Sequence, residues 1–513
     1  MNTEGDNIGV GEEPAVAGRL TFRRVFVAFF PLVALIGMIV FGVTVFGRDV
    51  GDGPSQISLV FATALAAVVA VVVDRVPWRA LENGITSSIS KAGVSIMILF
   101  LIGMLSGAWM IGGVVPTLIC YGVKIMNPSL FLACACIISA IVSLMTGTSW
   151  TTVATIGVAL LGIGTALGIP APWCAGAIIS GAYFGDKLSP LSDTTILASS
   201  STGTDLFVHI KYMLITTVPS MALTLLIFLV ARFFLADASE ADVQSFTDGL
   251  SRAFNITPWT LLVPVATGVL IALRMPSLAV LFLSVLAGGV SAVVLQSDVL
   301  LSVVGEDAPS LLGYYKALMT TFFTSTHVAT GSEALDRLVS TRGMSGMLTT
   351  VWLILCAVSF GGVMYAGGML RTIADVALAC VRGVAGLVGA TAFTGALMNV
   401  AAGDQYISIL ITSDMFRGAY RDRGLEPRLL SRTIEDSSTV TSVLVPWNTC
   451  AMAQSASLGM ATVVYLPFCF FNILSPFMSV VVASLGWKIV RGEGGLSSAV
   501  APEGRTCSRA SGG

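Results

Sequence analysis

Residues 180–195 read Ser180-Gly-Ala-Tyr-Phe-Gly-Asp186-Lys187-Leu-Ser-Pro190-Leu-Ser-Asp193-Thr-Thr195. They bring together two carboxylates, a lysine, several hydroxyl groups and a helix-breaking proline. Residues 129–185, by contrast, carry no charged side chain. Ionisable groups at membrane depth cost roughly 2.5–3.5 kcal/mol each on insertion scales, so they usually mark the path of an ion or a substrate. Asp186 and Asp193 are therefore the first candidate site residues.

The composition around this stretch is typical of a protein that crosses a membrane many times. Hydrophobic residues make up 55% of the chain and charged residues 11%, against about 25% charged residues in soluble domains; mean hydropathy is +0.89. Apolar stretches of about the 20 residues that a spanning helix needs recur along the chain. They lie at 25–47, 55–73, 95–115, 129–147, 213–231, 256–273, 277–295, 347–370, 383–402 and 455–487. We predict an all-α polytopic membrane protein with about 10–14 membrane segments.

The two ends of the chain differ from the rest. Residues 1–18 are polar and acidic, and residues 491–513 are rich in glycine and serine, so we predict both to be disordered and cytoplasmic. The apolar run after Arg24 is too long for a typical signal-peptide core and is interpreted as the first span. The nine cysteines show neither metal nor disulfide spacing. A net charge of −2 without a basic patch gives no indication of a nucleic-acid partner.

Short motifs recur in the chain at a constant spacing. Gly112-Gly113 is echoed by Gly367-Gly368, Gly147-Thr-Ser-Trp150 by Gly403-Asp-Gln-Tyr406, and Pro190-Leu-Ser-Asp193 by Pro446-Trp-Asn-Thr449. The spacing is 256 residues from Gly112 to Gly368, from Gly147 to Gly403 and from Pro190 to Pro446. Self-similarity at one register predicts homologous halves. We place them at 19–235 and 256–490, joined by a linker at 236–255.

The charges predict the orientation of the two halves. Cytoplasmic flanks of membrane helices are enriched in Lys and Arg. Three arginines, Arg19, Arg23 and Arg24, precede the first predicted span, and Arg75, Arg79 and Lys91 follow the second. Arg274 follows the first span of the second half. The linker is mainly acidic, which suits the extracytoplasmic side. Both ends are then cytoplasmic and the halves are inverted, as is typical of secondary transporters with broken or re-entrant helices. We expect a multi-pass protein of the cell's inner (plasma) membrane.

Each half has a polar zone interrupted by glycine and proline, at 146–195 and 399–449. Irregular backbone at membrane depth is tolerated only where it is buried in protein or lines a cavity. Hydroxyl, amide and carboxylate oxygens suit a small hard cation such as sodium. We expect Asp186 and Asp193 to bind the transported Na⁺, with Lys187 as a charge partner. The full predicted ion- or substrate-binding set is Asp186, Asp193, Asp404, Glu435, Asp436, Thr148, Ser149, Ser189, Ser192, Thr194 and Asn448.

The predicted chemistry needs few groups. A carboxylate moved out of water takes up a proton more readily, and a nearby cation favours the ionised form and displaces that proton. One carboxylate that holds either a proton or a sodium ion, never both, is therefore a minimal antiporter.

Structural interpretations compete with each of these assignments. Asp186 could form a buried ion pair with Lys187 or with the second half, and Asp193 could be a helix N-cap. Glu435 and Asp436 could pair with arginines at the cytoplasmic face, and the serines and threonines could join helices by hydrogen bonds. The arginines that could pair are Arg428 and Arg432; with Arg417, Arg421 and Arg423 they form a loop that either sets orientation or attracts an anionic substrate.

At these residues the chain resembles the NhaC-type sodium/proton antiporter family, within the wider ion-transporter superfamily. The matching stretches are 180–195, Thr146-Gly-Thr-Ser-Trp-Thr-Thr152, Gly403-Asp-Gln-Tyr-Ile-Ser408, Ser431-Arg-Thr-Ile-Glu-Asp436, Pro446-Trp-Asn-Thr449, Tyr465-Leu-Pro467 and Phe470-Phe-Asn472. The family includes malate/lactate exchangers, so the resemblance implies exchange and leaves the substrate open. The chain departs from the family at Ile196, where asparagine is usual, at Val443, where proline is common, and at Ser413-Asp414, where a glycine and a basic residue are typical.

We predict a sodium/proton antiporter that works by alternating access without a cofactor. Its partners are Na⁺, H⁺ and the lipid bilayer, and the sequence leaves open whether it forms a homodimer. The alternative is a Na⁺- or H⁺-coupled exchanger of small organic acids, in which Lys187 or the arginine-rich loop would meet the substrate carboxylate. An enzyme is not predicted, because the sequence shows neither a nucleophile–base pair nor an aspartate-rich metal motif, and its two histidines, His209 and His327, are far apart. A passive channel would not drive uphill exchange.

Overall fold

The computed structural model describes residues 21–235, 240–305, 308–330, 335–336, 339–379 and 381–490. These residues are mostly helical, and their only strand-like pairing is an isolated bridge between Thr326 and Thr341. Nine of the described helices are long and apolar enough to cross a membrane, or up to eleven spans if each of two bent helix pairs counts as one. The predicted all-α, multi-pass architecture is confirmed. The predicted disordered ends, 1–18 and 491–513, lie outside the described residues.

The first part of the chain forms a series of helices that ends at α10. The series is α1 (Phe22–Phe46), α2 (Pro54–Val72), α3 (Trp78–Ile111), α4 (Val114–Ile125), α5 (Phe131–Thr146), α6 (Ser149–Thr152), the π-helical turn η3 (Val153–Gly157), α7 (Val158–Ala166), α8 (Ala171–Leu188), α9 (Asp193–Thr202) and α10 (Leu206–Ala231). The chain then forms α11 (Glu240–Ala253), η5 (Pro258–Leu261) and α12 (Leu262–Ala272).

A second series follows and ends at α24. It consists of α13 (Ser277–Leu295), α14 (Ser297–Ser302), α15 (Leu311–Phe323), η6 (Ser345–Met347), α17 (Leu348–Ala366), α18 (Met369–Ala379), α19 (Gly383–Ala402), α20 (Gln405–Asp422), α21 (Pro427–Ile434), the π-helical turn η7 (Glu435–Thr439), η8 (Ser442–Leu444), α22 (Thr449–Leu458), α23 (Thr462–Tyr465), η9 (Leu466–Phe468) and α24 (Phe470–Ser484).

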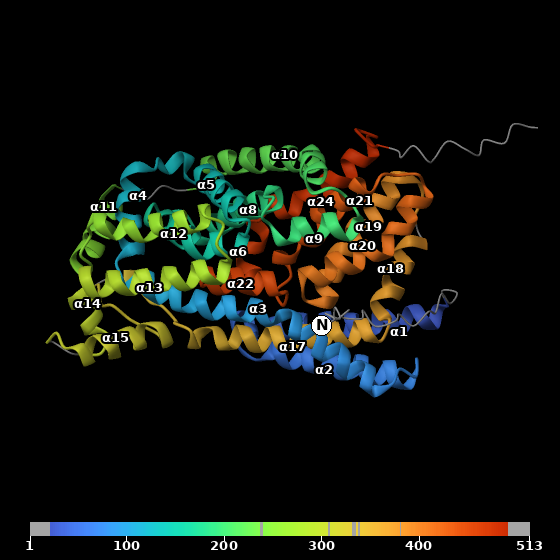
Figure 1. Ribbon diagram of the computed structural model, residues 1–513, viewed down its shortest axis with the longest axis horizontal. Coiled ribbons are helices and arrows are strands. Elements are labelled where there is room, and N and C mark those ends of the chain that lie inside the picture. Colours follow the sequence, from blue (N-terminus) through green and yellow to red (C-terminus); the bar gives the residue numbers. More distant parts are fainter. Residues whose placement is uncertain are drawn as a thin grey trace, which may run out of the picture.

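The two series match at the spacing that the sequence predicts. Helices α9 and α22 begin 256 residues apart, at Asp193 and Thr449, and both end before a left-handed glycine, Gly203 or Gly459. Gly147 and Gly403, with φ of 68° and 66°, likewise end α5 and α19. Some partner helices lie on opposite sides of the molecule, with α13 and α15 at the left of Figure 1 and α1 and α2 at the right, whereas α3 and its partner α17 pack together.

The structure corrects two details of the predicted repeat. The left-handed glycines of the first motif are Gly113 and Gly368, so this motif recurs after 255 residues, and the predicted match of Gly112 with Gly368 is wrong by one position. The predicted span 455–487 is not one helix, because α22 ends at Leu458 and the chain bends by 55° between η9 and α24. Helices α11 and α12 lie between the two series, and the positions 256 residues away from them, 496–509 and 6–16, lie outside the described residues.

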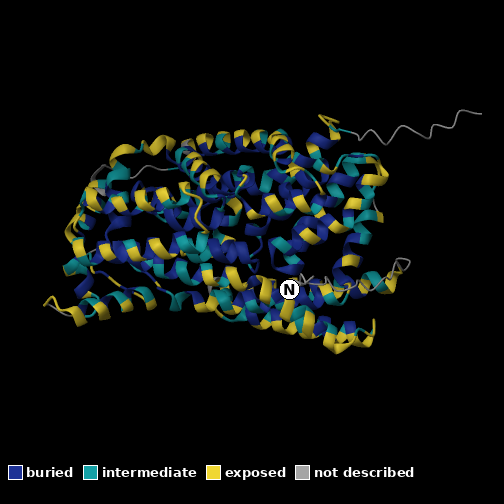
Figure 2. Cartoon of the chain, in the orientation of Figure 1, coloured by how far each residue is buried: buried dark blue, intermediate teal, exposed yellow. Residues whose placement is uncertain are grey.

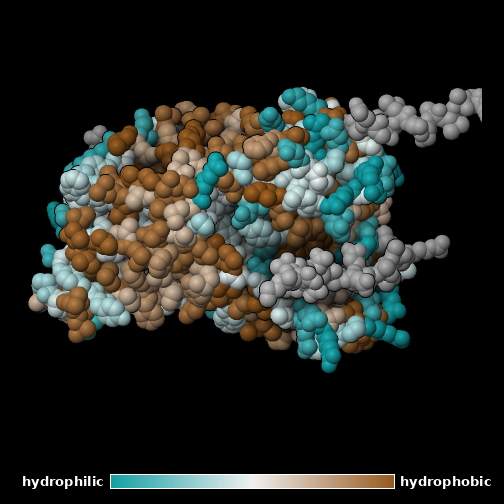
Figure 3. All heavy atoms as spheres, in the orientation of Figure 1, coloured by the Kyte–Doolittle hydropathy of each residue, from teal (hydrophilic) through white to brown (hydrophobic). Residues whose placement is uncertain are grey.

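The outer surface carries many of the large apolar side chains. Phe41 and Val72 are each 70% exposed and Val290 is 63% exposed, whereas buried residues fill the interior (Figure 2). Hydrophobic side chains cover much of the visible face, and hydrophilic ones gather toward its ends (Figure 3). An apolar exterior of this kind faces lipid in a multi-pass membrane protein.

Close packing of α8 on α5 fixes the position of the signature stretch. A Cβ atom at Gly181 would lie 2.0 Å from the Cys136 carbonyl oxygen, and one at Gly185 would lie 2.2 Å from that of Ala140. Glycines four residues apart let two helix backbones approach closely, as is common in membrane helices. The end of α8, which carries Asp186 and Lys187, is thereby held against α5.

Candidate functional site

Asp186 lies at the end of α8, where it meets the start of another helix. Its side chain is buried, with 7% exposed, and its Oδ2 accepts a hydrogen bond of 2.9 Å from the backbone N–H of Ser149, the first residue of α6. A helix N-terminus favours a negative charge. Ser192 and Asp193 also lie near enough to interact with this carboxylate. No ion pair of Asp186 with another described residue is found, so the interpretation that Lys187 pairs with it is wrong.

Lys187 pairs instead with Asp436, in the π-helical turn of the other half of the chain. Both side chains are fully buried. Asp436 also accepts hydrogen bonds from Ser479, at 2.6 Å, and Ser475, at 3.3 Å, on α24. Nε of Arg432 lies 4.0 Å from the same carboxylate. This cluster joins the two halves through charge.

Glu435 precedes Asp436 and is also fully buried. No hydrogen bond of ordinary geometry from the described residues reaches either carboxylate oxygen. It lies near enough to interact with Lys187, Asp186 and Asp436. Of the predicted pairing of Glu435 and Asp436 with Arg428 or Arg432, the described residues show only the 4.0 Å approach of the fully buried Arg432 to Asp436. Arg428 pairs with Glu426 instead.

Asp404 occupies the equivalent helix start in the second half. It caps α20 by accepting hydrogen bonds at Oδ1 from the N–H groups of Tyr406, at 2.9 Å, and Ile407, at 3.1 Å. Its Oδ2 accepts a hydrogen bond of 3.1 Å from the Thr449 hydroxyl at the start of α22. The side chain is only 4% exposed.

The remaining predicted residues lie around these helix starts. Asp193 is exposed and is the first residue of α9. The N-cap of α9 is Ser192, which accepts a hydrogen bond from Thr195 N–H, so the interpretation of Asp193 as the N-cap is wrong. Hydroxyl contacts link Ser192 with Thr194, at 3.0 Å, and Ser189 accepts from Leu191 N–H. Thr148 occupies the N-cap position just before α6, and Asn448 caps α22 by accepting a hydrogen bond from the Cys450 N–H.

Several polar residues of this region were not predicted from the sequence. They are Tyr183, Asn399, Gln405, Tyr406, Ser442, Ser475 and Ser479. The repeat spacing could have found two of them, because Gln405 and Ser442 are the equivalents of Ser149 and Asp186. The Ser442 hydroxyl donates to Gln405 Oε1 at 3.4 Å, which is the second-half counterpart of the contact between Asp186 and Ser149.

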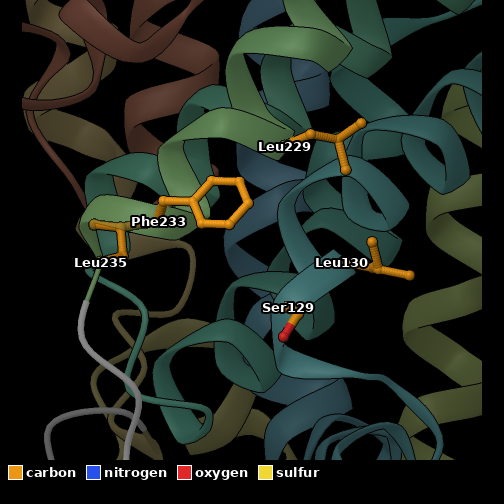
Figure 4. Close-up of a pocket in the computed structure, with 5 residues that line it drawn as sticks. All are labelled: Ser129, Leu130, Leu229, Phe233 and Leu235. Atoms are coloured by element: carbon orange, nitrogen blue, oxygen red, sulfur yellow. The ribbon is translucent and has the colours of Figure 1, made fainter.

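The polar interior is distinct from a cavity elsewhere in the described part of the chain. That cavity has a volume of about 520 Å³ and lies between the start of α5 and the end of α10. Its lining residues are Ser129, Leu130, Leu229, Phe233 and Leu235 (Figure 4). None of them is a candidate site residue. Among the described residues, no group of three or more His, Cys, Asp or Glu side chains could hold a metal ion.

Broken helices that meet inside an apolar, multi-pass protein, with carboxylates at their ends, define the class of ion-coupled secondary transporters. The family model described as "Na+/H+ antiporter family" matches residues 14–199 and 181–487. The chain belongs to this family, and the resemblance to NhaC-type antiporters is confirmed.

Named relatives cover most of the chain. The Na(+)/H(+) antiporter NhaC of Alkalihalophilus pseudofirmus is 36% identical over 84% of this chain and 90% of its own length. The malate-2H(+)/Na(+)-lactate antiporter of Bacillus subtilis is 34% identical over 85% of this chain and 90% of its own. The arginine/ornithine antiporter ArcD of Halobacterium salinarum is 33% identical over 90% and 92%. All three are transporters by name.

Proposed function

We infer that this protein is a secondary antiporter that exchanges sodium ions for protons. One observation carries the inference: Asp186 is a buried carboxylate with no ion-pair partner among the described residues, held at a helix start by one N–H group. An unpaired carboxylate out of water favours its protonated form, and a sodium ion beside it favours the ionised form. The same group can therefore hold either cation, and family membership supports sodium and protons as the pair.

The neighbouring residues have complementary roles in this proposal. Asp193, which is exposed and close to Asp186, attracts the cation from water. The hydroxyls of Ser192 and Ser149 supply oxygen ligands beside the carboxylate. Ser189 and Thr194 order the turn between α8 and α9. The Lys187–Asp436 pair holds the two halves in register around the site.

The second half contributes a further set of residues to the proposed ion path. Asp404 and Thr449 form the second carboxylate–hydroxyl contact. Asn448 orders the start of α22, and Thr148 holds the equivalent position to Asp404 in the first half. Glu435, which is buried near Asp186, is placed to relay to solvent the proton that Asp186 releases when it binds sodium.

Transport by alternating access follows from the two repeats. We propose that the halves, 19–235 and 256–490, are inverted in the membrane and move against each other. The linker 236–255 then lies outside and both ends lie in the cytoplasm of a cell whose inner (plasma) membrane holds the protein. We also propose that the protein forms a homodimer. Cross-linking in native membranes tests the homodimer, and reporter fusions at each end of the chain test on which side of the membrane the ends lie.

The organic-acid exchanger is less well supported. A substrate carboxylate would need a free cation inside the protein, yet Lys187 is already paired with Asp436, and Arg432 lies buried beside the same carboxylate. The observation in favour of this alternative is the 34% identity to the malate/lactate antiporter.

The experiment uses purified protein in liposomes that contain a pH-sensitive dye. With an imposed pH gradient, external sodium should drive proton movement, and malate or lactate should not. Asp186→Asn should abolish the response, whereas Asp248→Asn, which removes an exposed carboxylate on α11, should keep it. A response to malate or lactate without one to sodium would reject the antiporter in favour of the alternative.

A further inference from the structure

The repeat spacing pairs individual polar residues as well as helices. Asp404 and Thr449 of the second half are equivalent to Thr148 and Asp193 of the first, at 256 residues each. Each half therefore has one carboxylate and one hydroxyl at these two helix starts, but in opposite order. In the first half the carboxylate starts α9, and in the second half it caps α20.

In the second half the Asp404–Thr449 pair is closed, which means that its two side chains are hydrogen-bonded to each other. The Thr449 hydroxyl donates to Asp404 Oδ2 at 3.1 Å, and the Thr449 N–H donates to the Gly403 carbonyl at 2.9 Å. Both side chains are buried, with 4% and 1% exposed. The starts of α20 and α22 are thus joined through side chain and backbone.

In the first half the Thr148–Asp193 pair is open, which means that no hydrogen bond joins its two side chains. Thr148 is half-buried and makes no capping hydrogen bond with its side chain. Asp193 is exposed, and no hydrogen bond joins it to Thr148, although both residues are described. The carboxylate of this pair is therefore buried in the second half and exposed in the first.

Other equivalent contacts are formed in both halves. Ser143 donates to the Ala182 carbonyl at 2.6 Å, and its equivalent, Asn399, donates to the Ser438 carbonyl at 2.6 Å. The contact of Asp186 with Ser149 and that of Ser442 with Gln405 are also both present. These contacts are present in both halves, whereas the helix-start pair is hydrogen-bonded in the second half alone among the described residues.

We propose that these two pairs are alternating gates, so that Thr148 and Asp193 close in a second conformation in which Asp404 and Thr449 open. The proposal rests on the transport function inferred above. Two homologous halves that surround one path can exchange conformations, and a ligand shifts the balance by its differential affinity for the two states. Asp193 and Asp404 then take turns in facing water, and Thr148 is a positioning residue that receives Asp193.

Labelling of the hydroxyl positions tests this exchange without removing a carboxylate. Thr148→Cys and Thr449→Cys are each reacted with a water-soluble maleimide at one pH, with and without sodium, and the rate of the unaltered chain is subtracted. The two rates should change in opposite directions, by about tenfold for each ~1.4 kcal/mol by which sodium favours one conformation. Ser200→Cys, at an exposed site on α9, should react at a constant rate.

Exchange of the two groups within a pair gives a second test. Asp193→Thr should lower transport by about tenfold or more, since hydrogen bonds to charged groups are the stronger ones. Adding Thr148→Asp, which restores the pair in the order of the second half, should return transport to within about threefold of wild type. Asp404→Thr with Thr449→Asp is the matched exchange in the second half and should behave in the same way.

The outcomes separate this proposal from the transport function. Labelling rates that change together, or that stay fixed while the wild-type protein exchanges sodium for protons, overturn the alternating gates. A failure of Thr148→Asp to rescue Asp193→Thr also counts against them. Opposite rate changes in a protein that does not exchange sodium for protons would retain the gates and reject the proposed substrates.

Discussion

Removal of one partner from the Lys187–Asp436 pair should destabilise the protein, and by different amounts from the two sides. In Lys187→Met, Asp436 keeps the hydroxyls of Ser475 and Ser479 and has the Arg432 guanidinium 4.0 Å away. In Asp436→Asn, the fully buried side chains of Lys187 and Arg432 both lose the carboxylate that lies beside them. The second change should therefore be the more harmful one.

The magnitude follows from the burial. Breaking a buried pair from one side costs about 3–5 kcal/mol, because the remaining charge has no compensation. Lys187→Met should lie near the lower limit, about 3 kcal/mol, and Asp436→Asn near the upper limit, about 5 kcal/mol. The double variant should be no less stable than Asp436→Asn alone, since one of the two cations is then gone.

The assay is unfolding of the purified protein by titration with sodium dodecyl sulfate, followed by tryptophan fluorescence. Arg421→Met is the control, because its ion pair with Asp422 is 83% and 75% exposed and exposed pairs contribute about 0–1 kcal/mol. A free energy of unfolding that falls more for Lys187→Met than for Asp436→Asn would refute the reasoning, and so would a loss no larger than that of the control.

Three further outcomes are expected. Gly181→Ala should lower the free energy of unfolding by about 1–3 kcal/mol in the same titration, because its Cβ would lie 2.0 Å from the Cys136 carbonyl oxygen; unchanged stability would contradict the α5–α8 packing. Asp404→Asn should keep a cap on α20 but raise the sodium concentration for half-maximal exchange in liposomes by about tenfold, and an unaltered sodium dependence would remove Asp404 from the ion path. Phe233→Ala, in the cavity of Figure 4, should leave exchange unchanged, whereas a loss would place that cavity on the path.

Features of the fold that depend on local sequence could be predicted. Gly147 and Gly403 end helices in the left-handed conformation, and each is followed by a polar helix start, so their equivalence was visible as a repeated motif. The bend near residue 468 was not predicted, because apolar composition identifies a membrane span but does not show whether the span is straight. The sequence also did not reveal that Gly113, and not Gly112, is the equivalent of Gly368, since two adjacent glycines fit either register.

The sequence predicted several of the buried acids but not the partners with which they pair. Asp186, Asp404 and Glu435 stood out as acids in apolar sequence, and all three are buried. The partner of Lys187 lies 249 residues away in the chain, at a distance that no local pattern encodes. Ser475 and Ser479 bind the same carboxylate from one face of α24, and their four-residue spacing was the only signal.

Proton release on sodium binding tests the central claim most directly. Purified protein in weakly buffered detergent solution is mixed with sodium chloride, and the change in pH is recorded, with choline chloride as the ionic-strength control. If Asp186 holds either a proton or a sodium ion, wild-type protein should release protons in proportion to the sodium bound, and Asp186→Asn should release markedly fewer. Sodium binding without proton release, or equal release from Asp186→Asn, would contradict the account.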